Sequence, residues 1–246
     1  WNALDIVLVR VETASGLVGW GEGFGYVCQH ATARAVTDVL SPFAMGKDST
    51  NPSKVNREAQ LALHLFGRFG ITMFAISALD IALWDIMGRA VGKPVHKLIG
   101  GAYRSEVVPY ATGLYFIDMN RLVEEAVEEA LEFKSDGFRA IKMKIGLGDL
   151  KLDARRVAAV REAIGPDIKL AVDANHCFSV PNAIKLGRML EEHDILWFEE
   201  PISPEDHDGY VEVTRALDMA VAGGENDFTR WGFRDVIADK AMDIVQ

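Results

Sequence analysis

Cysteine is scarce in this chain. Its 246 residues include two cysteines, Cys28 and Cys177, which are far apart in sequence and lack CxxC spacing. A disulfide framework or a zinc–thiolate site needs more thiols at closer spacing, so the sequence disfavours both. We expect both cysteines to be reduced, packed thiols.

Positive charge is also in short supply. The chain has 26 lysines and arginines against 36 acidic residues, which gives a formal net charge of −10 and a pI near 5.1. Nucleic acids and anionic membrane surfaces both require a basic face on a protein. We therefore expect neither as a partner, and a small soluble molecule instead.

Long hydrophobic runs are missing as well. No apolar run approaches the ~20 residues that span a bilayer, and the N-terminus lacks the basic segment, apolar core and cleavage site of a secretory signal. These absences favour the cytoplasm and no membrane partner. The rest of the composition, 49% hydrophobic and 25% charged, is that of an ordinary globular protein.

Residues 1–102 predict an α+β domain. Dense β-branched residues at 5–11, a turn at Ser15-Gly16 and residues 17–21 indicate an antiparallel hairpin. Apolar residues at three-to-four spacing then predict helices at 31–40, 54–65 and 74–91. Asp80 and Asp85 lie in the last of these helices, where we interpret them as capping or ion-pairing residues outside any site.

Residues 103–246 predict a second domain, because after Gly100-Gly101 short apolar strands alternate with amphipathic helices. The expected strands are 107–112, 140–145, 169–173, 195–199, 220–224 and 243–246. The expected helices are 121–133, 154–164, 182–191 and 210–217. Units recur at about 25 to 30 residues, the period of a parallel (β/α) barrel of the TIM type, of which this chain would hold roughly the first six strands. A doubly wound open sheet has the same alternation and remains the alternative.

Three carboxylates stand at or just past the ends of successive predicted strands. They are Asp173, Glu199 and Glu225, spaced 26 and 26 residues apart. Successive strand ends in a parallel barrel lie side by side, so the three acids would converge and repel one another unless a cation lies between them. Oxygen ligands without nearby cysteine or histidine favour one Mg²⁺ over zinc. The alternative, that each acid caps a helix or pairs with an arginine, suits any one of them but not three in register.

Two lysines share one face of the preceding strand. Lys142 and Lys144 are two residues apart, whereas Ile141, Met143 and Ile145 take the other face. A parallel barrel strand has no water-facing side, so both ammonium groups would point into the barrel toward the acids. Adjacent cations and desolvation lower lysine pKa values, which would make one of the pair a usable base; the pattern leaves open which one.

These motifs resemble the enolase superfamily, in particular its mandelate racemase and muconate lactonizing enzyme branch. The resemblance is carried by Lys142-Met143-Lys144, Asp173 with Asn175, Glu199-Glu200-Pro201, Glu225-Asn226, Gly19-Trp20-Gly21-Glu22 and residues 78–85. It implies an N-terminal α+β capping domain, Mg²⁺ on the three acids, Lys144 as general base, and Lys142 as an aid to the substrate carboxylate or a modulator of its neighbour.

The resemblance implies a reaction that removes the proton next to a carboxylate through an enediolate. Our leading hypothesis is dehydration of an acid sugar to a 2-keto-3-deoxy acid, with a racemase, epimerase or cycloisomerase as alternatives, since all share the first step. A non-catalytic binding protein that kept the fold and the metal cage is the alternative from another class.

Four further residues are candidates for binding the carboxylate substrate. Asn175 and Asn226 stand beside predicted metal ligands, where they would orient them or bind substrate hydroxyls. His176 would touch substrate or bond to the loop backbone with equal plausibility, and Glu200 follows a predicted ligand directly. We also expect the protein to form a homo-oligomer.

The sequence departs from the family pattern near its end. The family has a histidine paired with an aspartate, and a further glutamate, on later strands, whereas the last histidine here is His207. From Val107 to Gln246 there are 140 residues, against ~200 or more for a whole barrel. We therefore expect this sequence to be part of a longer natural chain.

Overall fold

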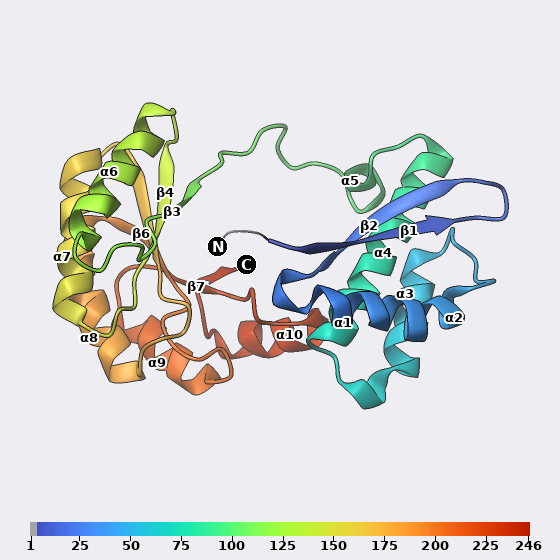
Figure 1. The fold of residues 1–246 in the computed structure, drawn as a ribbon. Coiled ribbons are helices and arrows are strands. Elements are labelled where there is room, and N and C mark those ends of the chain that lie inside the picture. The colour runs from blue at the N-terminus through green and yellow to red at the C-terminus, as the bar shows by residue number, and fades with distance from the viewer. Residues whose placement is uncertain (1–3) are drawn as a thin grey trace. The chain divides into compact units, whose positions relative to one another are not determined.

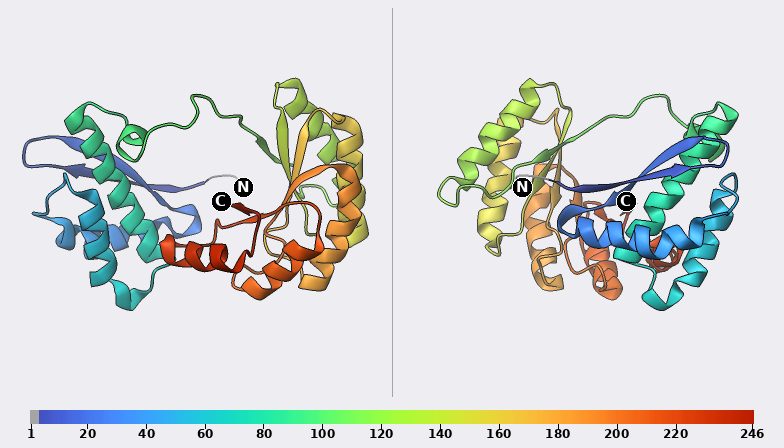
Figure 2. Two further views of the ribbon diagram at one scale, coloured as in Figure 1. Left: turned by 180° about the vertical axis from the view of Figure 1, so that it is seen from behind. Right: turned by 45° about the vertical axis from the view of Figure 1, so that its right-hand side comes forward.

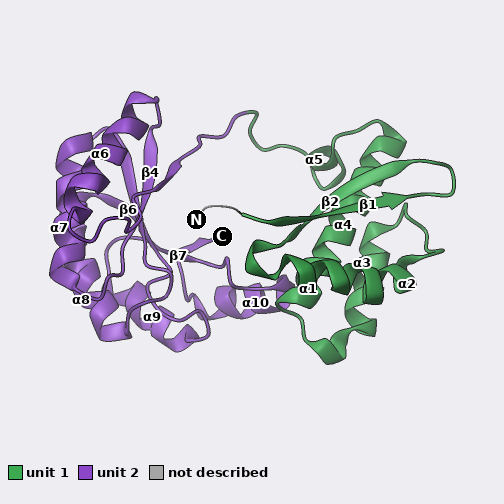
Figure 3. Cartoon of the chain, in the orientation of Figure 1, with its two compact units in different colours: residues 1–105 green, residues 106–246 purple. Residues whose placement is uncertain are grey.

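The structure, a computed structural model, describes residues 4–246; residues 1–3, with which the predicted first domain begins, lie outside the described residues. The chain divides into two compact units, residues 1–105 and 106–246 (Figure 3). The boundary predicted after residue 102 lies three residues before this division.

Unit 1 begins with the predicted hairpin. Strand β1 (Ile6–Glu12) pairs antiparallel with β2 (Val18–Phe24), from Ile6 opposite Phe24 to Glu12 opposite Val18 (Figure 1). The connecting turn places Gly16 at a φ of 83°, a conformation that glycine adopts without steric cost. The hairpin prediction is confirmed, although β2 extends three residues beyond the predicted end at residue 21.

Glycines let helix α4 (Ile71–Val91) pack directly on β2. The three buried residues of β2 face this helix, and all of them are glycines: Gly19, Gly21 and Gly23. A Cβ atom built on Gly21 would lie 1.9 Å from the carbonyl oxygen of Ala78. The helix therefore packs at a distance that no side chain on β2 would permit.

Replacing Gly21 with alanine is expected to destabilise unit 1 by more than the ~1–3 kcal/mol typical of an overpacked core, because the clash is with helix backbone rather than a flexible side chain. Urea denaturation of the variant measures the loss. The matched control is Glu22→Ala, at an exposed position of the same strand, which should stay within about 0.5 kcal/mol of wild type. Equal stability of the two variants would contradict this account of the packing.

Helix α4 corrects one expectation. The sequence analysis expected no segment that could cross a membrane, yet α4 is long and apolar enough to do so by length and composition. Asp80 and Asp85 interrupt its apolar run, so it does not stand out as a continuous one. In the structure it is the core helix of unit 1, with Ala75, Ile76 and Ala82 among its buried residues. The Asp85 carboxylate accepts hydrogen bonds from Trp20 N and from Arg89 Nε, both at 2.9 Å, which confirms its structural interpretation.

The other helices of unit 1 are short and pack around α4. They are α1 (Gln29–Arg34), a π-helical turn (Ala35–Leu40), α2 (Ser41–Ala44), α3 (Pro52–Ala62), α5 (Val95–Leu98) and 3-10 turns at Tyr26–Cys28 and His64–Phe66. The helix predicted at 31–40 is thus α-helical in its first part and π-helical in its second. Cys28 is a free, half-buried thiol, whereas Cys177 of unit 2 is free but exposed, so the expectation that it is packed is wrong.

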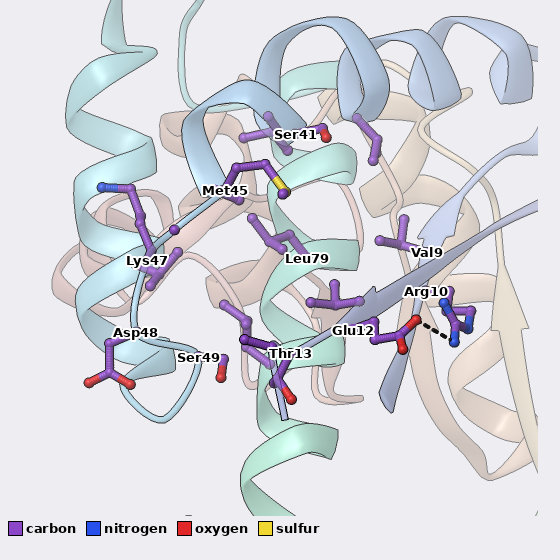
Figure 4. A pocket seen from close by; sticks show the side chains of 18 of the residues that line it. Val9, Arg10, Glu12, Thr13, Ser41, Met45, Lys47, Asp48, Ser49 and Leu79 are labelled. Atoms are coloured by element: carbon purple, nitrogen blue, oxygen red, sulfur yellow. Dashed lines mark ion pairs between the residues drawn. The ribbon is translucent and has the colours of Figure 1, made fainter. Parts of the chain in front are cut away.

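Unit 1 also contains a cavity of about 800 Å³ (Figure 4). Apolar side chains such as Val9, Leu79 and Leu83 line it together with polar groups, including the Arg10–Glu12 ion pair at 2.8 Å. None of the predicted site residues lines this cavity.

Unit 2 is a parallel sheet with helices packed on it (Figures 1 and 2). Its strands are β3 (Ala111–Gly113), β4 (Ala140–Lys144), β5 (Lys169–Asp173), β6 (Ile195–Glu199), β7 (Val221–Gly223) and β8 (Ile244–Val245). Its helices are α6 (Leu122–Ser135), α7 (Leu150–Ile164), α8 (Val180–Leu190), α9 (His207–Ala216) and α10 (Thr229–Asp239), with a 3-10 turn at Glu191–His193.

Strand order distinguishes the two folds that the sequence left open. The strands lie in chain order, β3-β4-β5-β6-β7-β8, and every neighbouring pair is parallel. In a doubly wound sheet the order of the strands reverses at a switch point, whereas in a barrel each new strand lies next to the one before it in the chain. The order is therefore that of a (β/α) barrel of the TIM type, as predicted.

The core of unit 2 lies between the sheet and its helices. Ile141, Met143 and Ile145 are buried there against residues of the surrounding helices. Because side chains alternate along a strand, Lys142 and Lys144 point to the other side of the sheet. That side carries the predicted site.

Candidate active site

Register aligns the key residues across neighbouring strands. Lys144, the last residue of β4, is paired with Asp173, the last residue of β5, and Asp173 is paired with Glu199, the last residue of β6. Three charged side chains therefore stand in a row at the carboxyl-terminal edge of the sheet, where (β/α) barrels carry their functional groups.

The two lysines contact the two acids directly. Lys142 Nζ lies 2.6 Å from Glu199 Oε1 and 3.2 Å from Asp173 Oδ2, and Lys144 Nζ lies 2.6 Å from the same Asp173 oxygen. The four side chains are 13% exposed or less, so the charges interact with little screening by water. The structure thus brings together four of the residues that the sequence predicted.

These contacts reverse one electrostatic expectation. Burial pushes the pKa of Lys142 down, but the hydrogen bond to Glu199 and the charges of Asp173 and Glu199 outweigh burial and raise the pKa above its ordinary value. For Asp173, burial would raise the pKa, whereas the hydrogen bonds from Lys144 and the Asn175 backbone, with both lysine charges, lower it. The sequence analysis expected the second lysine and desolvation to lower the pKa of one of the pair; at Lys142, Asp173 and Glu199 outweigh both effects.

Glu199 is held by more than Lys142. Its Oε2 atom accepts hydrogen bonds from Trp197 Nε1 and from Gln246 Nε2, each at 2.9 Å. Trp197 also packs edge-on against Tyr110 at 5.5 Å between ring centroids. Trp197 stands two residues before Glu199 and shares its face of the strand, so alternation along the strand could have predicted this contact from the sequence.

Asn175, Glu200 and Asn226 form a bridge beside these charges. Lys144 Nζ donates to Asn175 Oδ1 at 2.6 Å, and Asn175 Nδ2 donates to Glu200 Oε2 at 3.3 Å. Asn226 Nδ2 donates to Glu200 Oε1 at 2.5 Å. Hydrogen bonds therefore run without a gap from the end of β4, past β5 and β6, to the segment after β7, and both oxygens of the buried Glu200 are engaged.

The backbone at these strand ends is strained. Asn175, His176 and Glu200 have φ values of 40°, 56° and 42°, in the left-handed region that non-glycine residues avoid. His176 N donates to Glu200 O at 2.7 Å, which ties the two strand ends together, while the His176 side chain is exposed. Strain of this kind concentrates at functional sites, because the surrounding structure must hold it in place.

Glu225 stands apart from the other two predicted ligands. It is exposed as a residue, yet partial burial of its carboxyl group, followed by the charges of Glu200, Asp173 and Glu199, raises its pKa. Within residues 4–246, no three acidic, histidine or cysteine side chains converge closely enough to hold a metal ion as they stand. Asp173 and Glu199 turn oxygens to the lysines instead.

The donor set nevertheless fits a divalent cation. Glu225 together with Asp173, Glu199 and Glu200 places four carboxylates in one electrostatic neighbourhood, against the two ammonium groups of Lys142 and Lys144. Burial is the main cause of the raised pKa of Glu225, and the charges of Glu200, Asp173 and Glu199 raise it further. Carboxylate oxygens are the ligands that Mg²⁺ prefers, and an added divalent cation would balance the excess.

Family models match almost the whole chain. Residues 2–100 match the mandelate racemase / muconate lactonizing enzyme N-terminal domain, and residues 125–246 match the enolase C-terminal domain-like family.

Characterised relatives are similar over nearly the full chain. The chain is 38% identical to an arabinonate dehydratase of Saccharolobus solfataricus over 100% of its own length and 65% of the relative. It is 41% identical to a D-galactarolactone cycloisomerase of Agrobacterium fabrum over 98% of its length and 62% of the relative. The chain thus spans somewhat less than two thirds of these relatives.

Solved structures share the fold. A racemase from Streptomyces coelicolor A3(2) with bound magnesium superposes with a TM-score of 0.90 at 37% identity, covering 98% of this chain and 71% of that one. A 3,6-anhydro-D-galactonate cycloisomerase from Zobellia galactanivorans gives a TM-score of 0.90 at 40% identity, covering 98% and 66%.

Proposed function

Because this chain belongs to the mandelate racemase and muconate lactonizing enzyme family of the enolase superfamily, we propose that the protein is a magnesium-dependent enzyme that removes the proton next to the carboxylate of a sugar acid. The observation that carries the proposal is the cluster of Lys142, Lys144, Asp173 and Glu199 at the carboxyl-terminal edge of the parallel sheet.

The reaction class follows from the chemistry of such a substrate. A C–H bond beside a carboxylate is a very weak acid, and its conjugate base, an enediolate, carries two negative charges on oxygen. Mg²⁺ held by Asp173, Glu199 and Glu225 would supply the dense positive charge that stabilises those oxygens. The Lys142 ammonium, 9% exposed, adds a second positive charge that water screens weakly.

Lys144 is the proposed base. Its Nζ atom is fixed by Asp173 Oδ2 and Asn175 Oδ1, each at 2.6 Å, so its position is defined before substrate binds. In its neutral form the amine takes the α-proton and holds it as an ammonium. The proposed contacts to substrate hydroxyls are Asn175, Asn226 and the exposed His176. Glu200 orients the two amide side chains by accepting a hydrogen bond from each.

The second step separates two candidate activities. In a dehydration, a β-hydroxyl leaves after the proton is removed and a 2-keto-3-deoxy acid results. In a cycloisomerisation, a ring oxygen leaves instead. The relative at 38% identity is named a dehydratase and the relative at 41% identity a cycloisomerase. We propose dehydration as the leading reaction and cycloisomerisation as the second candidate.

A panel of aldonates, aldarates and their lactones, incubated with the protein and Mg²⁺ in D₂O, tests the proposal. Dehydration of an open-chain acid is expected to release water and a 2-keto-3-deoxy acid, whereas ring opening of a lactone to a keto-deoxy acid of the same mass indicates a cycloisomerase. Deuterium incorporation without either change indicates a racemase or epimerase. No exchange with any member, from protein shown to be folded, would contradict enzymatic function and favour a non-catalytic binding protein.

A further inference from the structure

A completely buried arginine lies behind the proposed base. Arg156 of α7 is 0% exposed, and its guanidinium donates to three backbone carbonyls: Lys144 O at 2.8 Å, Leu114 O at 2.9 Å and Leu122 O at 3.2 Å. The ring of Phe116 lies 4.6 Å from Arg156 Cζ. One side chain therefore joins the end of β3, the end of β4 and the start of α6.

Asp153, one turn earlier on α7, holds the chain that follows Lys144. It is also 0% exposed, and its Oδ2 atom accepts hydrogen bonds from Gly146 N and Leu147 N, each at 3.1 Å. Its Oδ1 atom has no hydrogen-bond partner among the described residues and lies 3.9 Å from Arg156 Nη1. The two side chains thus form hydrogen bonds with the backbone on both sides of Ile145.

The sheet holds this backbone on one side only: Lys144 is paired with Asp173 of β5, and Ile145 N donates to Asp173 O at 2.9 Å, whereas the β3 side has no pairing here. Strand β3 ends at Gly113, which pairs with Met143, so the carbonyl of Lys144 lies beyond the end of its neighbour. Leu114 then turns away with a φ of 57°. Buried carbonyls require hydrogen-bond donors, and Arg156 provides them with its fixed, planar set of N–H groups.

We propose that Arg156 and Asp153 are positioning residues for Lys144, and that they hold its backbone so that its amine meets the α-carbon of the substrate. The proposal rests on the proposed function for the role of Lys144. Apolar packing often matches a buried ion pair in stability, so the attraction between these two charges, which share no hydrogen bond, does not by itself account for the pair. A displacement of a reacting group by one ångström lowers the rate on the order of 100-fold, so holding the Lys144 backbone in place would be a function for the pair.

Helix α7 supplies a matched control in Arg161. Its guanidinium also donates to backbone carbonyls, those of His193, Gly165, Ile168 and Asp194 at 2.7–3.0 Å. These carbonyls precede β5 and β6, at the opposite end of the strands from Lys144. Loss of Arg161 therefore removes similar hydrogen bonds without releasing the segment that carries the proposed base.

The test compares Arg156→Met, Arg156→Lys and Arg161→Met. Both methionine variants are expected to lower the thermal denaturation temperature. Arg156→Met alone should lower kcat by roughly 10- to 100-fold, with KM and the Mg²⁺ dissociation constant near wild type. Arg156→Lys keeps the positive charge but has one donor nitrogen in place of three, so it should recover part of kcat. The ¹H–¹⁵N signal of the Lys144 ammonium, assigned by its absence in Lys144→Met, should shift or broaden in Arg156→Met and stay unchanged in Arg161→Met.

Equal kcat and an unchanged Lys144 signal in Arg156→Met and Arg161→Met would overturn the proposal and leave Arg156 a structural residue. If Arg156→Met does not fold, Arg156→Lys decides, and wild-type kcat with a wild-type signal overturns it. If the wild-type protein turns over no sugar acid, the proposed function fails, while the Lys144 signal still decides whether Arg156 positions that side chain.

Discussion

Replacing Lys144 with methionine is expected to slow exchange of the substrate α-proton with solvent by about 10²- to 10⁴-fold, the range that a positioned general base contributes. Methionine has a similar length and no proton-accepting nitrogen. Its Sδ and terminal methyl would take the places of the lysine Cδ and Cε, one bond short of the Nζ that now contacts Asp173 and Asn175, so most of the side-chain volume is kept while the base is lost.

The variant should remain folded, because Asp173 keeps its contact with Lys142 at 3.2 Å and the hydrogen bond from Asn175 N at 3.0 Å. Loss of exchange can therefore be assigned to chemistry rather than to unfolding. NMR of the substrate in D₂O, with circular dichroism as a check on the fold, makes the measurement.

Lys169→Met is the matched control. Lys169 is the first residue of β5, its side chain is 57% exposed, and its ammonium lies 3.9 Å from Asp194. It carries the same charge on the same sheet, so its removal should leave the exchange rate unchanged. Wild-type exchange in Lys144→Met would remove Lys144 from the mechanism and turn attention to Lys142.

The fold was predictable where packing and propensity agree. Strands β5 and β6 match the predicted ranges residue for residue, because each is a short apolar run that ends at an acid followed by turn-forming residues. The predicted strand at 107–112 was misplaced, since Val107 and Val108 are 79% and 77% exposed and only β3 at Ala111–Gly113 pairs. β-branched residues suggested a strand there, but within residues 4–246 no strand pairs with Val107 or Val108.

Helix α10 was not predicted, although Phe233, Val236 and Ile237 stand at helical spacing in its sequence. Val236 is the one buried residue among Thr229–Asp239, so this helix contributes little to the core of unit 2.

The site was predictable in its backbone and less so in its side chains. Alternation along β4 and register across the strand ends, both properties of the backbone, brought Lys142 and Lys144 to Asp173 and Glu199. The bridge through Glu200 and the hydrogen bond from Gln246 depend on side-chain rotamers set by residues distant in sequence, whereas Trp197 stands two residues before Glu199 on the same face of the strand. The raised pKa of Lys142 belongs to the same class, because it is set by contacts and not by spacing.

Replacing Glu225 with glutamine is expected to weaken Mg²⁺ binding by more than the ~10- to 100-fold that loss of an outer contact costs at a metal site, since a proposed ligand charge is removed. At 100 times its dissociation constant, Mg²⁺ should stabilise the wild-type protein by about 2.7 kcal/mol. A tenfold or greater loss of affinity reduces that gain to about 1.4 kcal/mol or less at the same concentration. Isothermal titration calorimetry and denaturation with and without Mg²⁺ measure both quantities.

The same substitution should leave the metal-free protein as stable as wild type or more so. The pKa of Glu225 is raised by burial and by the charges of Glu200, Asp173 and Glu199, so its ionised form is disfavoured in the folded protein. Its contribution to stability is therefore present below its unfolded pKa and is lost as pH rises through the folded pKa. Glutamine carries no charge, so the variant should escape that loss at neutral pH.

Glu162→Gln, at an exposed position on α7, is the control and should change neither Mg²⁺ affinity nor metal-free stability. The two readouts separate two roles of Glu225. A ligand predicts weaker Mg²⁺ binding together with undiminished metal-free stability, because the charge that repels its neighbours is the charge that holds the cation. A purely structural carboxylate predicts lower metal-free stability with Mg²⁺ affinity unchanged, and that result would place the third ligand elsewhere.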